Sequence, residues 1–308
     1  MNVLLFGDSF NDPGQFHLLR KNLGLDDLNV PLQSADGKRQ EIIHIRAING
    51  CASNGAVQAD FVAERLHMTA VAAFGLERLP EGTGHLLNFA LSGAAHYNNS
   101  SIFFAEDKPA PSFDIAYQIE KAKELGCQMS ERDICVIQTA YNDIFLINLI
   151  AQGVMGNLPE PTTADELEKR YVTAAIANIT SLYKMGCKRL LMPIFTSLEA
   201  LQTPNWKKTD AVFPGTLAAM DIRLARMQLS LKEAVAAQKW DGLVVDLIDA
   251  NSWWREVQAK MDVSTTLTDA GWTLESQLPN TNKLFFYDDT HPTQEAHKKL
   301  AKRLVRHI

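Results

Sequence analysis

A serine near the amino terminus and an Asp-His pair near the carboxyl terminus supply the residue types that acyl transfer requires. Ser9 lies in FGDSFNDPG, directly behind an apolar run, and Asp288 precedes His291 by three residues in YDDTHPT. A serine nucleophile needs a general base, and the base needs a partner that fixes its tautomer and stabilises its charged form. An Asp three residues before a His, on a turn held by a proline, can fold its carboxylate back onto the ring Nδ1. We therefore predict that Ser9, His291 and Asp288 form a catalytic triad.

Acyl transfer also needs hydrogen-bond donors aimed at the oxygen on which negative charge develops. Asn142 carries a side-chain amide, Gly55 offers a backbone N–H without a neighbouring Cβ, and the N–H of Ser9 is a third donor. Each residue also has a plainer explanation: a helix cap for Ser9, a turn before a helix for Gly55 and a loop cap for Asn142. Their expected meeting at one sheet edge favours an oxyanion hole made of Ser9, Gly55 and Asn142.

Two acidic residues flank the serine in the sequence. Asp12 and the Pro-Gly pair after it are expected to shape the loop that follows Ser9. Asp8 is expected to brace the turn by accepting hydrogen bonds from nearby amides. The glycine before Asp8 lets the chain turn sharply off the strand. Both aspartates are therefore predicted to shape the site.

The elements that must position these residues follow from the hydrophobic pattern. Five short apolar segments are predicted to be strands, at 2–6, 86–91, 134–139, 189–195 and 242–248. Helical patterns occupy 56–66, 112–126, 163–186 and 215–238, and an amphipathic helix ends the chain. Continuously apolar strands separated by helices are typical of a parallel sheet covered on both faces, so we predict a three-layer α/β/α sandwich. Ligands bind at the carboxyl ends of the strands in such sheets.

One domain, residues 1–308, is expected, because no linker or internal repeat divides the sequence. Two irregular stretches, about 92–111 and 262–283, are long for a compact domain and are candidate lids or insertions. His96, in the first of them, could touch substrate. Several large apolar residues near the second could line an acyl pocket, although a core position is the favoured interpretation: Trp253, Trp254, Trp272 and the run 284–286.

Composition argues against several classes of partner. The 308 residues include 46% hydrophobic and 21% charged residues, with a net charge of −6, so no nucleic acid partner is expected. The four cysteines lack metal-binding spacing and are expected to be buried thiols. No signal peptide and no membrane-spanning apolar stretch is evident in the sequence, so we expect a cytoplasmic protein, one exported without a classical signal peptide, or a trimmed mature form.

The segments that carry these residues resemble the sequence blocks of the SGNH hydrolases, the GDSL family. FGDSFNDPG resembles the block that opens the family, ASNGAVQADFVAERL the glycine block, and NFALSGA the strand and turn that follow it. AYND resembles the GxND block, and FFYDDTHPTQEAHKKLA is similar to the terminal DxxH block. The blocks occur in the family's order from residue 6 to residue 301, so the resemblance spans nearly the whole chain.

This resemblance implies that Ser9 is the nucleophile, that Asp288 and His291 form the base, and that Gly55 and Asn142 complete the oxyanion hole. It implies a flavodoxin-like sheet of about five strands in the order 2-1-3-4-5. The match is most similar to the GDSL lipase/esterase branch with its phospholipases A, lysophospholipases and acyltransferases. The implied substrate is therefore a small-molecule ester or a lipid, with no cofactor or metal, and with membrane contact only through substrate.

The chain departs from the family pattern at three positions. Phe10, Gln15 and Ala140 stand where Leu, Asn and Gly are usual. The methyl group of Ala140 could tilt Asn142 and weaken the oxyanion hole.

Other functions also fit these residues. The same acyl-enzyme gives acyl transfer if an alcohol replaces water. A non-catalytic lipid- or glycan-binding relative would keep the same segments. A metal-dependent phosphoesterase would instead use carboxylates and one histidine as ligands: Asp8, Asp12, Asn142, Asp143, Asp288 and His291. The acyl length and the oligomeric state stay open.

Overall fold

A six-stranded sheet in the order β4-β5-β1-β6-β7-β8 forms the centre of the computed structural model. Every neighbouring pair of these strands is parallel. The strands are β1 (Val3–Gly7), β4 (Thr69–Ala72), β5 (His85–Asn88), β6 (Ile134–Gln138), β7 (Arg189–Ile194) and β8 (Val244–Asp249). The structure describes residues 1–22, 31–33, 39–41, 51–97, 114–139, 141–151, 163–267 and 281–308.

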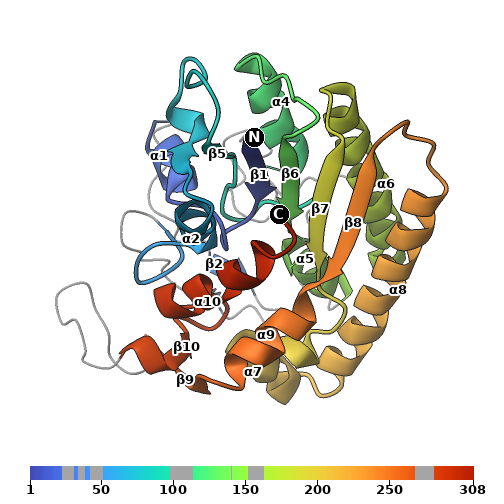
Figure 1. Ribbon diagram of the computed structural model, residues 1–308. Helices are drawn as coiled ribbons and strands as arrows, with labels where there is room; N and C mark the ends of the chain where they lie inside the picture. The colour runs from blue at the N-terminus through green and yellow to red at the C-terminus, as the bar shows by residue number, and fades with distance from the viewer. Residues whose placement is uncertain are drawn as a thin grey trace.

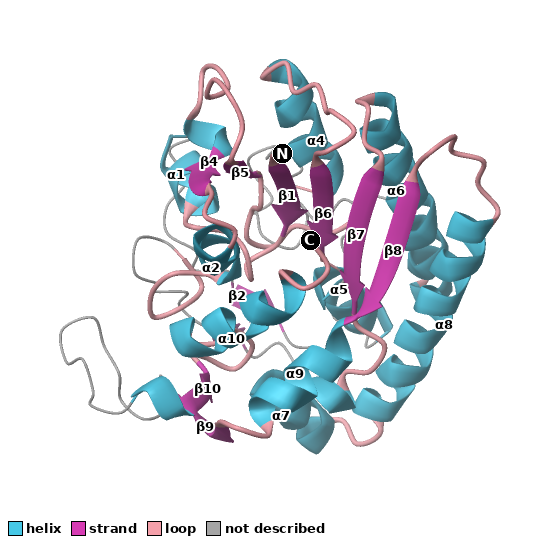
Figure 2. Ribbon diagram, in the orientation of Figure 1, coloured by secondary structure: helices cyan, strands magenta, loops and turns pink. Residues whose placement is uncertain are grey.

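Helices cover both faces of this sheet (Figures 1 and 2). The α2 and α10 helices lie in front of the sheet in the view of Figure 1, and α4 and α6 lie behind it. The helices are α1 (Gln15–Asn22), α2 (Gln58–Arg65), α4 (Ile115–Glu124), α5 (Tyr141–Ala151), α6 (Ala164–Lys184), α7 (Pro204–Val212), α8 (Thr216–Ala236), α9 (Ala250–Gln258) and α10 (Gln294–Leu304). The predicted three-layer α/β/α fold is thus confirmed.

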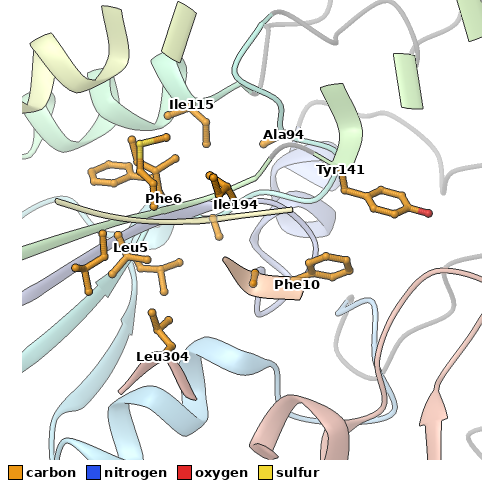
Figure 3. Packing of buried hydrophobic residues seen from close by; sticks show 14 of the residues in the cluster. Leu5, Phe6, Phe10, Ala94, Ile115, Tyr141, Ile194 and Leu304 are labelled. Carbon is orange, nitrogen blue, oxygen red and sulfur yellow. The ribbon is translucent and has the colours of Figure 1, made fainter. Parts of the chain in front are cut away.

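The central strands are buried because their side chains are apolar on both faces. All five residues of β1 and of β6 are buried. Phe6 packs on the side of Ile115 of α4, and Leu5 lies toward Leu304 of α10 (Figure 3). Side chains of β1 thus pack against the helices on both faces of the sheet. Phe6 also stacks on Phe89, with ring centroids 5.1 Å apart. The sheet is therefore the rigid element from which the site projects.

The predicted strands correspond to β1, β5, β6, β7 and β8, and their spatial order is the predicted 2-1-3-4-5. The strand predicted at 86–91 ends at Asn88, although the N–H groups of Phe89 and Leu91 still donate to the carbonyls of Leu5 and Gly7. The sheet has one more strand than predicted, because β4 has only four residues and none is buried. Such a strand lacks the apolar run on which the prediction relied.

Smaller elements complete the described chain. A two-stranded antiparallel pair joins β2 (Pro31–Gln33) to β3 (Arg39–Glu41), and β9 (Asp262–Thr266) lies parallel to β10 (Leu284–Phe286). Single 3-10 turns occupy Ala73–Gly75, Glu199–Leu201 and Thr281–Lys283. The second predicted irregular stretch thus begins with a strand, and residues 98–111 and 268–280 of the two stretches lie outside the described residues.

Two further predictions concern side chains and membranes. All four cysteines are free and buried, as predicted for structural thiols. None of the helices in the described part of the chain is long and apolar enough to cross a membrane.

Candidate active site

The turn that presents Ser9 begins at the carboxyl end of β1, where only glycine fits. A Cβ at position 7 would lie 2.8 Å from the carbonyl oxygen of Gln138 in the neighbouring strand β6. The side chain of Gln118, from α4, holds the same residue by accepting the Gly7 N–H at 2.9 Å and donating to the Gly7 carbonyl at 2.8 Å. The start of the Ser9 turn is therefore fixed from two sides.

Ser9, His291 and Asp288 lie in one hydrogen-bonded line, although 282 positions separate the serine from the histidine. The Ser9 Oγ is 2.9 Å from the His291 Nε2. The His291 Nδ1 is 2.9 Å from Asp288 Oδ2 and 3.0 Å from Oδ1. With Nδ1 protonated and bound to the carboxylate, Nε2 is left to accept the serine proton. Ser9 and His291 are each 8% exposed, so the reacting atoms lie largely away from bulk water.

The electrostatics of the pair suit a general base. Burial raises the pKa of Asp288, but the His291 charge and the hydrogen bonds from His291 and Thr290 outweigh burial and hold it below its ordinary value. Burial lowers the pKa of His291, but the charge and hydrogen bond of Asp288, with the charge of Asp8, raise it above its ordinary value. The site therefore stabilises the imidazolium that forms when His291 takes a proton.

The loop that carries Asp288 and His291 is fixed by its own backbone and by α7. Asp288 Oδ1 accepts the N–H groups of Thr290 at 2.8 Å and His291 at 2.7 Å, and Tyr287 N–H donates to the His291 carbonyl at 2.7 Å. The α7 helix contacts the loop through Lys208 Nζ, which lies 2.7 Å from Asp289 Oδ1. The loop that carries His291 is thus held independently of Ser9.

Asp8 is buried beneath the serine turn, as a bracing residue would be. Its Oδ1 accepts the Phe10 N–H at 3.1 Å, and its carbonyl accepts the N–H groups of Asn11 and Asp12. Burial raises the pKa of Asp8 to about 7, against the Phe10 hydrogen bond and the His291 charge. The carboxyl therefore contributes to the turn and to the field around His291.

Asp12 joins the serine loop to the loop that follows β5. Its Oδ1 accepts the N–H groups of Gly14 at 2.9 Å and Gln15 at 2.6 Å, at the start of α1. Its Oδ2 accepts both the N–H and the hydroxyl of Ser92 at 2.8 Å, and the N–H of Phe16 at 3.3 Å. Burial raises the pKa of Asp12, and the Ser92 and Gln15 donors oppose that shift. One buried carboxylate thus ties together two segments of the site.

The candidate oxyanion-hole residues come from three separate elements. Asn142 lies in the first turn of α5, where its Nδ2 donates to the Ala94 carbonyl at 2.9 Å, which leaves its second amide N–H. Gly55 precedes α2, whose first N–H donates to the carbonyl of Phe10 in the serine loop. The backbone N–H groups of Ser9 and Gly55 have no hydrogen-bond partner within the part of the chain that the structure describes. Ala140 lies outside the described residues.

The neighbouring Asp143 and His96 have structural surroundings. Asp143 accepts the N–H groups of His96 and Tyr97, and burial raises the pKa of Asp143 to about 7. The His96 ring packs edge-on against Tyr171 of α6, with Asn178 Nδ2 3.3 Å from its Nδ1. Burial lowers the pKa of His96 to about 3, so the ring is neutral. The α6 helix thus holds the His96 side chain in a buried place, 2% exposed, and this gives the residue a structural role.

Sequence reasoning missed the supporting role of two buried glutamines, of which it had named Gln15 only as a departure from the family pattern. Besides Gln118, Gln15 donates to the Asn88 and Ala90 carbonyls at 3.0 Å and accepts the Phe74 N–H at 2.9 Å. A signal for Gln118 exists in the helical pattern, since it shares the buried face of α4 with Ile115 and Ile119. A polar residue on an apolar stripe indicates a buried hydrogen bond.

The large apolar residues near the carboxyl terminus belong to the core, which is the interpretation favoured from the sequence over an acyl pocket. Trp254 is 2% exposed, and Phe285 and Phe286 are fully buried. Trp254 lies against Phe285 with ring centroids 5.0 Å apart. Trp272 lies outside the described residues.

The acidic residues named for a metal site hold backbone N–H groups, at separate places around the serine turn. Within the described ranges, no three His, Cys, Asp or Glu side chains are arranged to hold a metal ion.

Comparison with known proteins shows which family and which solved structure the chain is similar to. The family model described as GDSL-like Lipase/Acylhydrolase matches residues 3–304. Among solved structures, the chain is similar to a member of the lipolytic protein G-D-S-L family from Veillonella parvula DSM 2008, with 11% sequence identity and a TM-score of 0.42. That alignment covers 99% of this chain and 97% of the other. No curated protein matches the sequence.

Proposed function

Since the chain belongs to the family of GDSL-like lipases and acylhydrolases, hydrolases that act on ester bonds, we propose that it is a serine carboxylester hydrolase that works through an acyl-enzyme on Ser9. The observation that carries this proposal is the 2.9 Å contact between Ser9 Oγ and His291 Nε2, in line with the Asp288 carboxylate. Nucleophile, base and base-orienting group are thus already within hydrogen-bond reach.

In the first proposed step, Ser9 Oγ attacks the ester carbonyl while His291 Nε2 takes the hydroxyl proton. The Asp288 carboxylate stabilises the imidazolium, which is consistent with the raised pKa of His291. The imidazolium then donates its proton to the leaving alcohol as the ester C–O bond breaks. In the second step His291 Nε2 takes a proton from a water molecule as the water oxygen attacks the acyl carbon. The imidazolium then returns this proton to Ser9 Oγ as the bond between the acyl carbon and Oγ breaks, which releases the carboxylic acid and restores the Ser9 hydroxyl.

The developing oxyanion is proposed to accept hydrogen bonds from the backbone N–H of Ser9, the backbone N–H of Gly55 and the side-chain amide of Asn142. Two facts support these assignments. The first two N–H groups have no partner among the described residues, and the Asn142 amide is anchored through Ala94 at 2.9 Å. An anchored donor needs no reorganisation as charge develops, which is what makes such groups effective.

Within the ester hydrolases we propose a phospholipase A or lysophospholipase-like activity on a lipid ester. This finer assignment rests on the similarity of NFALSGA and DDTHPT to the lipase/esterase branch. Acyl transfer is the competing outcome, and it differs only in which acceptor reaches the acyl-enzyme.

The first experiment is fluorophosphonate labelling followed by intact and peptide mass spectrometry, with and without EDTA. A single adduct on the Ser9 peptide that EDTA does not affect is the expected result. Ser9→Ala should abolish the adduct and lower the esterase rate on the order of 10³-fold or more, and Asn142→Ala should lower it roughly 10²- to 10³-fold. Ser264→Ala, at an exposed serine of β9, is the matched control and should change neither. An unlabelled wild type with an EDTA-sensitive phosphodiesterase activity would contradict the triad.

Substrate class is tested next with esters of graded acyl length, then with diacyl and lysophospholipids, with released fatty acid as the readout. An added alcohol acceptor separates hydrolysis from transfer, because transfer yields a new ester in place of free acid. Preference for short acyl chains over every phospholipid would contradict the lipid assignment and leave the general esterase.

A further inference from the structure

Phe10, the residue after Ser9, is the centre of an aromatic cluster at the carboxyl ends of the central strands. Its side chain is 2% exposed. Its ring lies edge-on to the His291 ring, with centroids 6.0 Å apart and planes at 78°. It also contacts Tyr141 at 6.1 Å, Trp254 at 5.5 Å and Phe195 at 6.4 Å between centroids. Figure 3 shows the Phe10 and Tyr141 rings together beyond the end of the sheet.

The backbone of Phe10 is held as firmly as its ring. Its N–H donates to Asp8 Oδ1 at 3.1 Å, and its carbonyl accepts the Gln58 N–H of α2 at 3.3 Å. The backbone hydrogen bonds hold the main chain of Phe10 in the Ser9 turn, and the packed rings hold its side chain in the cluster. Phe10 therefore links the turn that presents Ser9 to the residues that its ring contacts, His291 among them.

The hydrogen bonds of the His291 side chain are made by its two ring nitrogens and lie near the plane of the ring. Its Nδ1 bonds to both oxygens of Asp288, and its Nε2 faces Ser9 Oγ. These bonds constrain distances within the ring plane, but they resist rotation of the imidazole out of that plane only weakly. A packed aromatic neighbour supplies the missing constraint, because edge-to-face ring pairs have a preferred geometry.

We propose that Phe10 is a positioning residue for His291: its ring fixes the plane of the imidazole so that Nε2 stays aligned with Ser9 Oγ. This inference rests on the proposed role of His291 as the general base. Through Tyr141, which precedes Asn142, the same ring also connects the base with the proposed oxyanion-hole element. One side chain thus sets the relative placement of three segments that meet at the site.

The test compares Phe10→Leu and Phe10→Met with Phe195→Leu. Phe195 is the matched control, because it is 2% exposed and packs against Phe10 and Trp254, whereas among the described residues the His291 ring has its aromatic contact with Phe10 and not with Phe195. A water-soluble short-chain ester gives kcat and KM separately, and the fluorophosphonate labelling rate reports the serine-histidine pair alone. Thermal denaturation reports the packing cost of each variant.

We expect both Phe10 variants to lower kcat and the labelling rate roughly 10- to 100-fold with KM within about threefold, because misalignment of reacting groups affects the chemical step. Phe195→Leu should lower the denaturation temperature comparably but leave kcat within about twofold. The low-field Nδ1–H proton resonance of His291 should broaden in the Phe10 variants alone.

The proposal is overturned if the Phe10 variant that folds best keeps kcat within twofold of the wild type. It is equally overturned if Phe195→Leu lowers kcat as much as Phe10→Leu, since the effect would then be general packing. Failure of the proposed function is distinguishable, because the wild type itself would then show neither labelling of Ser9 nor ester hydrolysis.

Discussion

Asp12→Asn is the sharpest test of how the site is assembled, because it replaces one buried carboxylate oxygen with an NH₂ group and leaves the size and shape of the side chain unchanged. The Asp12 carboxylate is fully buried and accepts five hydrogen bonds, from the N–H groups of Gly14, Gln15, Phe16 and Ser92 and from the Ser92 hydroxyl. All four backbone partners are donors that cannot reverse their role.

An asparagine keeps one acceptor oxygen and replaces the other with an NH₂ group. If the oxygen stays with Gly14 and Gln15, the NH₂ group faces the N–H of Ser92, which donates at 2.8 Å in the native loop. An unpaired buried N–H costs about 1–3 kcal/mol, and the remaining bonds lose the assistance of a charge. The opposite amide orientation leaves the N–H groups of both Gly14 and Gln15 without their acceptor, at a cost at least as large. We expect Asp12→Asn to lower the free energy of unfolding by about 2–4 kcal/mol.

The assay is urea denaturation together with kcat/KM on a soluble ester, for Asp12→Asn and for Asp114→Asn. Asp114 caps α4 by accepting the Tyr117 N–H at 2.9 Å. Asparagine caps helices about as well, so that control should lose less than about 0.5 kcal/mol. In the folded fraction of Asp12→Asn, kcat/KM should fall about 10-fold, since Ser92 no longer holds its loop against the Ser9 turn. A loss below about 1 kcal/mol, or an equal loss in the control, would refute this account of the junction.

Three further predictions concern packing and protonation. In Gly7→Ala, the new Cβ would lie 2.8 Å from a backbone carbonyl of β6, so urea denaturation should show a loss of about 1–3 kcal/mol; Gly75→Ala, whose Cβ meets no atom within 4 Å, is the control. Asp288 is the chief cause that raises the pKa of His291 above its ordinary value of 6.5. Because protonated His291 cannot act as a base, kcat/KM of the wild type should fall on the acid side with a midpoint above pH 6.5. In Asp288→Asn this midpoint should move to lower pH, and the rate should fall roughly 10³- to 10⁴-fold. Burial lowers the pKa of His297 to about 3, so as the pH falls the unfolded chain binds a proton there before the folded chain does, and the wild type loses stability. The free energy of unfolding of His297→Leu relative to that of the wild type should therefore increase by about 1.4 kcal/mol for each pH unit as the pH falls from about 6 to about 4, as measured by denaturation.

The parts of this fold that the sequence predicts are those with local signals. The strands β1 and β6 are continuous apolar runs because both sheet faces are covered, and such runs are visible in the sequence. The pairing of Asp288 with His291 is likewise local, because three residues of a tight turn carry both groups. Their meeting with Ser9 has no local signal, because the loop follows β10, which pairs with β9 outside the central sheet. That prediction comes from chemistry, since a serine nucleophile needs a general base.

The parts that escaped prediction depend on which surfaces meet. Nothing in TAVA distinguishes β4 from a loop, since its four residues gain strand structure only by pairing with β5. The His96 ring turns toward α6 because Tyr171 and Asn178 lie there, and the position of α6 relative to that loop has no local signal. Tertiary contacts decide such cases.

The proposed triad is assembled from two halves that are fixed by separate networks. Gln118 and Asp12 hold the Ser9 turn against α4 and the loop after β5, whereas backbone bonds and Lys208 hold the His291 loop. The contacts described here between the halves are the Ser9–His291 hydrogen bond at 2.9 Å and the ring contact of Phe10 with His291. Damage within one half should therefore appear first in the free energy of unfolding, whereas damage at the joint should lower kcat by more than its packing cost explains. That contrast makes Asp12→Asn and Phe10→Leu complementary tests, with Phe195→Leu giving the change in kcat that a packing loss alone produces.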